Sequence, residues 1–391
     1  MLVLLQKLST VITPGFDSNT RLMLIAPHPD DEALACSVIL QQALRAGAAV
    51  RVIYATDGDN NPWPQRFVER KWRLAMGDRR RWGKLRRAEA LAALRVLGAP
   101  ASNVRYLALP DQGLTDLLTR NCGSMLELFK TMISRWAPTH LLVPSIADRH
   151  PDHNALGVML RLASCDFPLP AGQMSIWSYA VHGKSGAFTN RAINLQQSKD
   201  EALTKVRAIR CHKTQLKLSQ RRFLGYATRP EQFLKLRPRE ETVADGSIHS
   251  VTRQADMLRL KLQLTMQPLP AAKPRLFVLG YDRSGALTCV SIRLPSRPTR
   301  ILSCVAGRQL DTMRYRGNAF AGEASIPIDR FSHVHPLFVK LERRGWFFDE
   351  GGWLEVPAVA PPQRITVRRQ DLEESSLAIS WARRAGSSSA M

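Results

Sequence analysis

The chain has 391 residues, of which 56 are Lys or Arg and 33 are Asp or Glu, so its formal net charge is +23. The length accommodates a full catalytic domain and a second, smaller one, and the charge favours anionic partners such as phosphates or acidic glycans. Six widely spaced cysteines without a Cys-x-x-Cys pair argue against a disulfide scaffold and a structural zinc site. No run of about 18 apolar residues is present that could span a bilayer.

Apolar strands and helical patterns alternate as far as about residue 235. We expect strands near 22–26, 50–55, 104–107, 140–143 and 175–181, and helices near 32–46, 85–97, 123–136, 154–163 and 199–213. This alternation predicts an α/β domain over residues 1–237, with a Rossmann-like, doubly wound and mostly parallel sheet.

A first polar cluster follows the first predicted strand. The apolar residues 22–25 lead directly into Ala-Pro-His-Pro-Asp-Asp-Glu, which places His28, Asp30 and Asp31 between the strand end and the next helix. An Asp-Asp pair at this position is, taken alone, more typical of an N-terminal helix cap.

A second cluster follows the predicted strand 140–143. It has the sequence Asp-Arg-His-Pro-Asp-His over residues 148–153 and contains His150 and His153. A single His-x-x-His is a weak metal signal. Open α/β sheets, however, place their functional sites outside the carboxyl ends of parallel strands, so two such clusters at two strand ends favour one shared site.

The residue types in these clusters suit a catalytic zinc. Zinc takes three protein ligands, keeps a fourth position for water and lowers the pKa of that water to about 7. His28, Asp31 and His153 supply such a set. Asp30 is then available to take a proton from the attacking water and pass it to a leaving amine, and His150 to stabilise an oxyanion or act as the acid.

Further motifs stand in an order that resembles the PIG-L/LmbE-like family of zinc-dependent de-N-acetylases. The resemblance covers roughly residues 20–235. Besides the two clusters it includes Thr56-Asp57-Gly58, Arg86-Arg87-Ala88-Glu89, Leu109-Pro110-Asp111 and the segment 205–215.

The resemblance implies the same roles for the five cluster residues, with Zn²⁺ as cofactor and Fe²⁺ as an alternative metal. It also implies that Arg86 binds substrate and that Asp111 is either a substrate contact or an acid that supports a ligand. The implied reaction is hydrolysis of the acetyl group from an N-acetylglucosamine-type unit, which releases acetate and a free amine. The family does not determine what the sugar is attached to.

A strongly basic segment lies between the Thr56-Asp57-Gly58 turn and the helix predicted at 85–97. Ten Lys or Arg residues occur between positions 66 and 87, among them Arg79, Arg80 and Arg81, and Trp82 is one of several interspersed aromatics. We expect these four residues to contact an anionic membrane, as basic and aromatic side chains do together. A solvated loop is the plainer interpretation. We do not expect nucleic acid as a partner, because no recognition helix, zinc finger or OB-type pattern accompanies the charge.

The remaining sequence predicts a β-rich accessory domain over 238–360 and a partly disordered tail over 361–391. Near its end, Trp346, Phe347, Phe348 and Trp353 surround several glycines. Such aromatics either stack on sugar rings or fill a small core, and the sequence leaves both interpretations open.

We therefore expect a metal-dependent de-N-acetylase that acts on a glycolipid or cell-envelope glycoconjugate such as lipopolysaccharide. The N-terminus lacks a charged leader and a cleavage site, so we expect a cytoplasmic protein, peripheral on the inner face of the membrane. Two alternatives remain open at this stage. One is an amidase for a small soluble glycoside or thiol conjugate, and the other is a non-catalytic protein that binds glycans or membranes. The oligomeric state is not predicted.

Overall fold

The computed structural model describes most of the chain between residues 10 and 359. The described ranges are 10–12, 14–120, 122–165, 174–183, 192–236, 247–254, 256–263, 274–294, 300–306, 309–318, 320–342, 344–345 and 348–359. The predicted domain boundary at 237/238 and the predicted tail over 361–391 lie outside these ranges.

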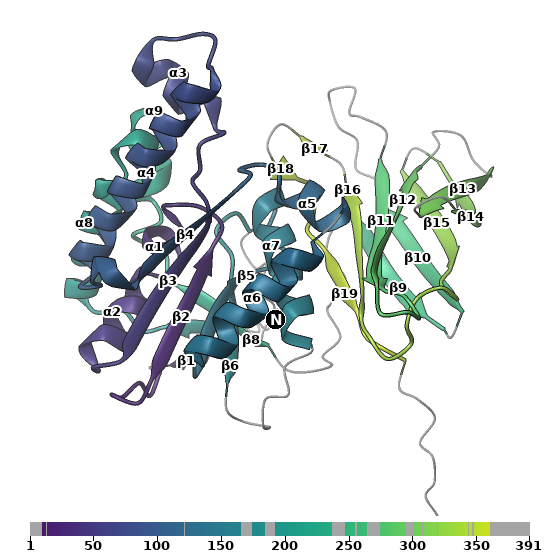
Figure 1. Ribbon diagram of the computed structural model, residues 1–391, viewed down its shortest axis with the longest axis horizontal. Coiled ribbons are helices and arrows are strands. Elements are labelled where there is room, and N and C mark those ends of the chain that lie inside the picture. Colours follow the sequence, from purple (N-terminus) through teal and green to yellow (C-terminus); the bar gives the residue numbers. More distant parts are fainter. Residues whose placement is uncertain are drawn as a thin grey trace, which may run out of the picture.

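A mixed sheet forms the centre of the N-terminal part (Figure 1). Its strand order is β1-β7-β8-β6-β5-β2-β3-β4. The bounds are β1 (Thr10–Ile12), β2 (Arg21–Ala26), β3 (Ala49–Thr56), β4 (Val104–Leu109), β5 (His140–Pro144), β6 (Ser175–Tyr179), β7 (Ile193–Leu195) and β8 (Gln232–Leu236). The strands β6, β5, β2, β3 and β4 pair in parallel, whereas β8 is antiparallel to β6 and β7. The five predicted strands are confirmed, and β8 makes the sheet mixed. The finer Rossmann-like description stays a prediction.

Helices cover both faces of this sheet. Their bounds are α1 (Asp31–Leu34), α2 (Ser37–Arg45), α3 (Pro62–Glu69), α4 (Met76–Val96), α5 (Leu114–Arg120), α6 (Gly123–Trp136), α7 (Pro151–Cys165), α8 (Lys199–Cys211) and α9 (Lys213–Leu224), with a 3₁₀ turn at Ala101–Asn103. Alternate side chains of β2 point to opposite faces, as in any strand. Leu22 and Leu24 pack in a core with α2, α4 and α8, and Met23 and Ile25 in a second core with α5, α6 and α7.

Most of the basic segment is helical, which corrects the plainer interpretation of a solvated loop, and residues 70–75 connect its two helices. It forms α3 and the first part of α4, and Figure 1 shows these two elements projecting beyond the central sheet. Asp78 fixes the connection between them, because its carboxylate accepts hydrogen bonds from Ala75 N (3.0 Å) and Lys71 Nζ (2.7 Å) while its carbonyl accepts from Gln65 (2.8 Å). The bond from Ala75 N to the Asp78 side chain is one half of a capping box and closes the first turn of α4.

The C-terminal part forms a second, antiparallel sheet in the order β19-β16-β11-β12-β13-β14-β15-β10-β9. The bounds are β9 (Ile248–Arg253), β10 (Met257–Gln263), β11 (Arg275–Tyr281), β12 (Leu287–Arg293), β13 (Arg300–Ala306), β14 (Gln309–Gly317), β15 (Ala321–Pro327), β16 (Leu337–Glu342) and β19 (Leu354–Val356). Inward side chains from distant strands, such as Leu260 of β10 and Val278 of β11, share one core, so the sheet curls upon itself. The predicted β-rich character is confirmed. Among the described helices, none combines the length and the apolar character that crossing a bilayer requires.

The second sheet packs directly against the helices α5 to α7. Phe277, Phe338 and Trp353 belong to the same core as the apolar residues of those helices. Arg161 of α7 also pairs with Glu355 of β19. The C-terminal sheet therefore lies against the helix layer formed by α5, α6 and α7.

Candidate active site

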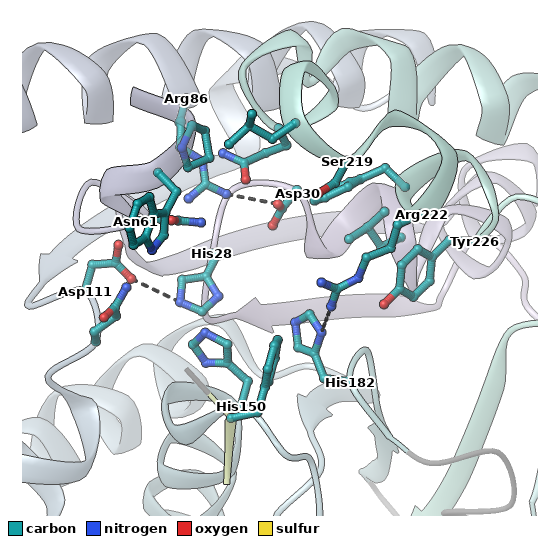
Figure 2. A pocket seen from close by; sticks show the side chains of 18 residues that line it. His28, Asp30, Asn61, Arg86, Asp111, His150, His182, Ser219, Arg222 and Tyr226 are labelled. Carbon is teal, nitrogen blue, oxygen red and sulfur yellow. Dashed lines mark hydrogen bonds and ion pairs between the residues drawn. The ribbon is translucent and has the colours of Figure 1, made fainter. Parts of the chain in front are cut away.

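The site lies where five parallel strands end. Each of β2, β3, β4, β5 and β6 is followed within a few residues by a polar side chain that lines or supports a common pocket. The two sequence clusters contact each other at this edge of the sheet. The pocket has a volume of about 320 Å³, and Figure 2 shows His28 and His150 facing each other in it.

Three candidate ligand side chains from the two clusters lie close together. His28 Nδ1 is 3.2 Å from His153 Nε2, His153 Nε2 is 3.4 Å from Asp31 Oδ1, and His28 Nδ1 is 3.9 Å from Asp31 Oδ2. A tetrahedral zinc with ligands at about 2.0–2.1 Å separates its ligand atoms by about 3.3 Å. His28, Asp31 and His153 therefore fit a zinc ion in number, chemistry and spacing. His150 also falls within a group of histidine nitrogens that could hold a metal with His28 and His153.

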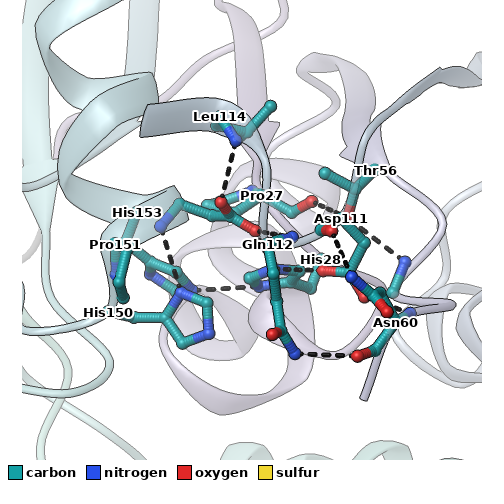
Figure 3. A network of polar contacts seen from close by, with 12 residues as sticks. Pro27, His28, Thr56, Asn60, Asp111, Gln112, Leu114, His150, Pro151 and His153 are labelled. Carbon is teal, nitrogen blue, oxygen red and sulfur yellow. Dashed lines mark hydrogen bonds and ion pairs between the residues drawn. The ribbon is translucent and has the colours of Figure 1, made fainter. Parts of the chain in front are cut away.

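The other ring nitrogen of His28 is held by carboxylates. Its Nε2 lies 3.2 Å from Asp111 Oδ1 and 3.2 Å from Asp152 Oδ2 (Figure 3). These three groups also meet the spacing of a metal site. Asp152, however, accepts backbone hydrogen bonds from Gln112 (2.6 Å) and Leu114 (3.1 Å), and Asp111 accepts one from Asn60 (2.6 Å). Carboxylates on the far nitrogen of a histidine ligand are typical supports of that ligand, so we place the metal on the Nδ1 side.

Asp148 joins the end of β5 to the end of β6. It is fully buried and accepts hydrogen bonds from His150 N (2.8 Å), Val181 N (2.9 Å) and His182 N (3.1 Å). Its Oδ2 also lies 3.4 Å from His153 Nδ1. Although burial opposes it, His153 holds the pKa of Asp148 below its usual range. Asp148 therefore supports His153 in the way that Asp111 and Asp152 support His28.

The charges around His28, Asp31 and His153 favour binding of a cation. Burial raises the pKa of Asp31 to about 6, even though His153 acts in the opposite direction. For His28 and His153, burial lowers the pKa, but the surrounding carboxylates outweigh burial and leave both values above the ordinary one. A bound metal ion would satisfy the carboxylate and replace the protons on both imidazoles.

Zinc affinity should consequently increase with pH. A metal binds neutral imidazole, so below the raised pKa values of His28 and His153 it has to displace protons. We expect the apparent dissociation constant to fall by about tenfold per pH unit for each displaced proton as the pH rises toward these raised pKa values, and to level off above them. Chelator competition at a series of pH values measures this directly, and a dissociation constant independent of pH would contradict the assignment.

Asp30 and Arg86 form a buried pair at the pocket. Arg86 Nη2 lies 3.0 Å from Asp30 Oδ2 and donates to Pro29 O (2.8 Å), while Nη1 donates to Gly58 O (2.8 Å). Gly58 has φ of +62°, and a Cβ there would lie 1.7 Å from the guanidinium, so only glycine fits. Asp30 itself has φ of 155°, which a residue with a side chain rarely adopts. Its carbonyl is held by Ala33 N and Leu34 N, both at 3.0 Å.

His150 presents a hydrogen-bond donor to the pocket. Its Nδ1 accepts from Asp152 N at 3.2 Å, so the proton of the neutral ring lies on Nε2. Burial, reinforced by His28, lowers the pKa of His150 well below the ordinary value. Burial likewise lowers the pKa of His182 to about 3. Both rings are therefore neutral near pH 7.

The seven predicted catalytic, metal and substrate residues all lie in this site: His28, Asp30, Asp31, Arg86, Asp111, His150 and His153. Arg79, Arg80 and Arg81 are exposed on α4. Trp82 is only 1% exposed, which corrects its predicted place on an anion-binding surface. It occupies the buried face of α4 together with Arg86, Glu89, Ala90 and Ala93.

Sequence reasoning missed several residues of the pocket. His182 follows β6, so the rule that found the other strand-end residues applies to it as well. Arg222 and Tyr226 come from α9 and the turn after it, and Phe348 comes from the C-terminal part. No local pattern singles out Arg222 and Tyr226, and the sequence indicates Phe348 only as one of four aromatics with two open interpretations, because only the folded chain brings these residues to the pocket.

Comparisons with known proteins agree with the motifs. Residues 23–164 match the family model described as PIG-L: GlcNAc-PI de-N-acetylase. The 1D-myo-inositol 2-acetamido-2-deoxy-alpha-D-glucopyranoside deacetylase of Mycobacterium sp. (strain KMS) is 30% identical over 148 residues, which are 34% of this chain and 46% of that protein. The chain thus spans a little under half the length of the curated relatives it matches.

Two solved structures are similar to this chain. The N,N'-diacetylchitobiose deacetylase of Pyrococcus horikoshii is 17% identical with a TM-score of 0.43, and the match covers 56% of this chain and 84% of that one. The zinc-inhibited form of teicoplanin deacetylase is 20% identical with a TM-score of 0.43, and the match covers 55% of this chain and 97% of that one. The resemblance indicated by the motifs is confirmed for residues 23–164, which carry the sequence pattern of the PIG-L family.

Proposed function

We propose that the protein is a metal-dependent amidohydrolase that removes the acetyl group from an N-acetylated amino sugar. The observation that carries this proposal is the set of ligand atoms on His28, Asp31 and His153, spaced 3.2–3.9 Å apart. The adjacent carboxylate of Asp30 lines the same pocket. The family pattern over residues 23–164 supports the same reaction class.

The metal held by His28, Asp31 and His153 would act as a Lewis acid on the amide carbonyl and lower the pKa of an attacking water. Zn²⁺ suits the donor set, and Fe²⁺ is the alternative. Asp111, Asp152 and Asp148 keep the two histidine ligands in place through the contacts described above.

Asp30 moves the proton in this proposal. It takes a proton from water as the water oxygen adds to the acetyl carbon, and it returns that proton to the nitrogen as the C–N bond breaks. Arg86 holds one carboxylate oxygen of Asp30 at 3.0 Å, which leaves the other oxygen available for the attacking water. Arg86 also borders the pocket, where it can contact substrate. The Nε2–H of His150 donates to the oxygen that becomes negative in the tetrahedral intermediate.

The direct test is turnover. Metal-free and zinc-loaded protein should be incubated with free and lipid-linked N-acetylglucosaminyl substrates while acetate and primary amine are quantified. We expect equal amounts of both products with zinc-loaded protein only. Stoichiometric zinc binding without product from any sugar amide would favour the alternative of a non-catalytic glycan-binding protein.

We further propose that the substrate is a glycolipid or lipid-linked envelope glycoconjugate at the inner face of the cytoplasmic membrane. The projecting arm formed by α3 and the start of α4 supports this. Its large apolar side chains are exposed: Trp63 by 42%, Phe67 by 60%, Trp72 by 75% and Met76 by 70%. Arg66 joins two of them, because its guanidinium carbon lies 5.2 Å from the ring of Trp63 and 5.1 Å from that of Trp72.

The charge of the arm matches an anionic surface. Arg70, Lys71, Arg73, Arg79 and Arg80 are all exposed around the aromatic side chains. Aromatic rings at head-group depth and cations on phosphates are the usual combination in peripheral membrane proteins. Trp63 belongs both to the arm and to the lining of the pocket, so a docked bilayer would present its head groups beside the site.

Anionic liposomes should therefore bind the protein at low salt. The double variant Phe67→Ser/Trp72→Ser should lose most of this binding, whereas Phe320→Ser, which removes a 55% exposed aromatic from the C-terminal sheet, should retain it. Co-sedimentation with phosphatidylglycerol and with phosphatidylcholine vesicles measures the effect. Equal sedimentation of both variants, or none by the wild type, would favour an amidase for a small soluble glycoside or thiol conjugate.

A further inference from the structure

Among the described residues of the C-terminal part, Phe348 reaches the pocket. Phe348 belongs to β18 (Phe348–Asp349), which pairs with β17 (Arg344–Gly345) in a two-stranded ribbon. Its ring centroid lies 5.1 Å from that of His182 and 5.8 Å from that of His150, and the guanidinium carbon of Arg222 lies 5.5 Å from it. Phe348 is half-buried and forms part of the pocket lining.

The residue after Phe348 is fixed by a buried polar network. Asp349 is fully buried, and its Oδ2 lies 2.5 Å from Lys340 Nζ of β16 and 3.2 Å from Asn154 Nδ2 of α7. Lys340 is also fully buried and donates to Asn154 Oδ1 at 3.2 Å. Because buried charges are costly unless paired and hydrogen-bonded, this network holds β18 in one position.

Backbone contacts join the same segment to the loop that carries His150. Asp349 N donates to Arg149 O at 2.8 Å, and Arg149 Nε donates to Asp349 O at 3.2 Å. Trp353 N donates to Ile146 O at 2.7 Å. A Cβ at Gly352 would lie 2.1 Å from Ile146 O, so the close approach of the two segments requires glycine there. The ring of Phe348 is therefore presented to the pocket by a rigid support.

We propose that Phe348 is a specificity-determining residue whose ring forms an apolar wall for the pyranose of the substrate. A pyranose has a face of C–H groups that packs well on an aromatic ring, while its hydroxyl groups remain available for polar partners such as Arg222. The inference rests on the proposed function and adds that the C-terminal part, through the β17–β18 ribbon, forms part of the substrate site. The sequence left open whether the aromatics of this segment stack on sugars or fill a core, and in the structure the two described members differ. Trp353 is 2% exposed and packs in the core, whereas Phe348 faces the pocket.

The experiment compares zinc-loaded wild type, Phe348→Ala, Phe348→Tyr and the control Phe320→Ala. The dissociation constant of methyl N-acetyl-glucosaminide is measured by calorimetry, beside KM and kcat for release of its acetyl group. Phe348→Ala should bind the glycoside about three- to tenfold more weakly and raise KM to the same extent, while kcat and zinc affinity stay unchanged. Phe348→Tyr should restore most of the affinity, and Phe320→Ala should resemble the wild type.

Two results would overturn the proposal: unchanged glycoside affinity in Phe348→Ala, or weaker zinc binding and lower kcat with the glycoside affinity retained. The proposed function fails separately. If zinc-loaded wild type binds the glycoside without releasing acetate, the ratio of dissociation constants still decides the role of Phe348. If wild type binds no glycoside at all, the wall for a sugar ring is contradicted as well.

Discussion

Replacing Asp30 by Asn should abolish most of the hydrolysis while leaving zinc in place. Asn has nearly the same shape and can still accept the hydrogen bond from Arg86, but it cannot take a proton from water. Loss of a positioned general base costs about 10²- to 10⁴-fold in rate, so kcat should fall within that range. The metal ligands His28, Asp31 and His153 are retained, so zinc content and zinc affinity should stay near the wild-type values.

The matched control is Asp59→Asn. Asp59 lies in the loop after β3, near Asp57 and Asp111, but it is not part of the pocket lining. Its replacement removes the same charge from the region without removing the proposed base, so kcat should stay close to wild type. An Asp30→Asn protein with full activity would exclude Asp30 as the base, and an equal loss in both variants would point to the electrostatic field of the region instead.

Replacing His153 by Ala should remove the metal. The change deletes one of three protein ligands and leaves the buried carboxylates of Asp31 and Asp148 without their imidazole partner. Loss of a residue that merely supports a ligand costs about 10- to 100-fold in metal affinity, so loss of a ligand should cost more than about 100-fold. After dialysis against a weak chelator, elemental analysis should find zinc in the wild type and none in the variant, and turnover should be lost with it.

A histidine elsewhere provides the comparison for this experiment. His249 of β9 is exposed on the C-terminal sheet, and His249→Ala should keep its zinc and its activity. Circular dichroism and the thermal midpoint of each variant separate loss of metal from loss of fold. A folded His153→Ala protein that retains one zinc with unchanged affinity would show that the metal lies elsewhere, for example among His28, Asp111 and Asp152.

The central strands and the main site could be predicted because their signals are local. Runs such as Leu22–Ile25 and Leu141–Val143 are buried on both faces, as parallel strands between two helix layers are. Their carboxyl ends then meet at one edge of the sheet, which brings His28 and His153 together although 125 positions separate them. The pattern of buried parallel strands and the types of residue that follow them were therefore sufficient to predict this part of the site.

The arm was predicted less well, because charge and aromatic content gave no clear period for α3. For Trp82 the helical spacing of the sequence indicated a buried position, but the prediction relied on the charge content of the segment. Trp82, Arg86, Glu89 and Ala93 recur at helical spacing, so they share the buried face of α4. Charge count alone placed Trp82 on the surface, whereas helical periodicity places it inside.

Contacts of the C-terminal part with the site were beyond sequence reasoning. Phe348 approaches the site because the second sheet packs on α7, whereas His182 follows β6 and obeys the same strand-end rule as the predicted residues. The Lys340–Asp349 pair resembles an ordinary surface charge pair in the sequence but is fully buried in the structure. Pairing of this kind depends on the relative placement of two sheets, which no local pattern encodes.

The most direct test of the account is a zinc titration of metal-free protein during turnover. Primary amine release from an N-acetylglucosaminyl substrate is followed as zinc is added in fractions of an equivalent. We predict that the rate rises in proportion to zinc and reaches a plateau at one equivalent per chain, as expected for a single site built on His28, Asp31 and His153. Equal amine release by the metal-free and the zinc-loaded protein would contradict the central claim that this metal centre carries the hydrolysis.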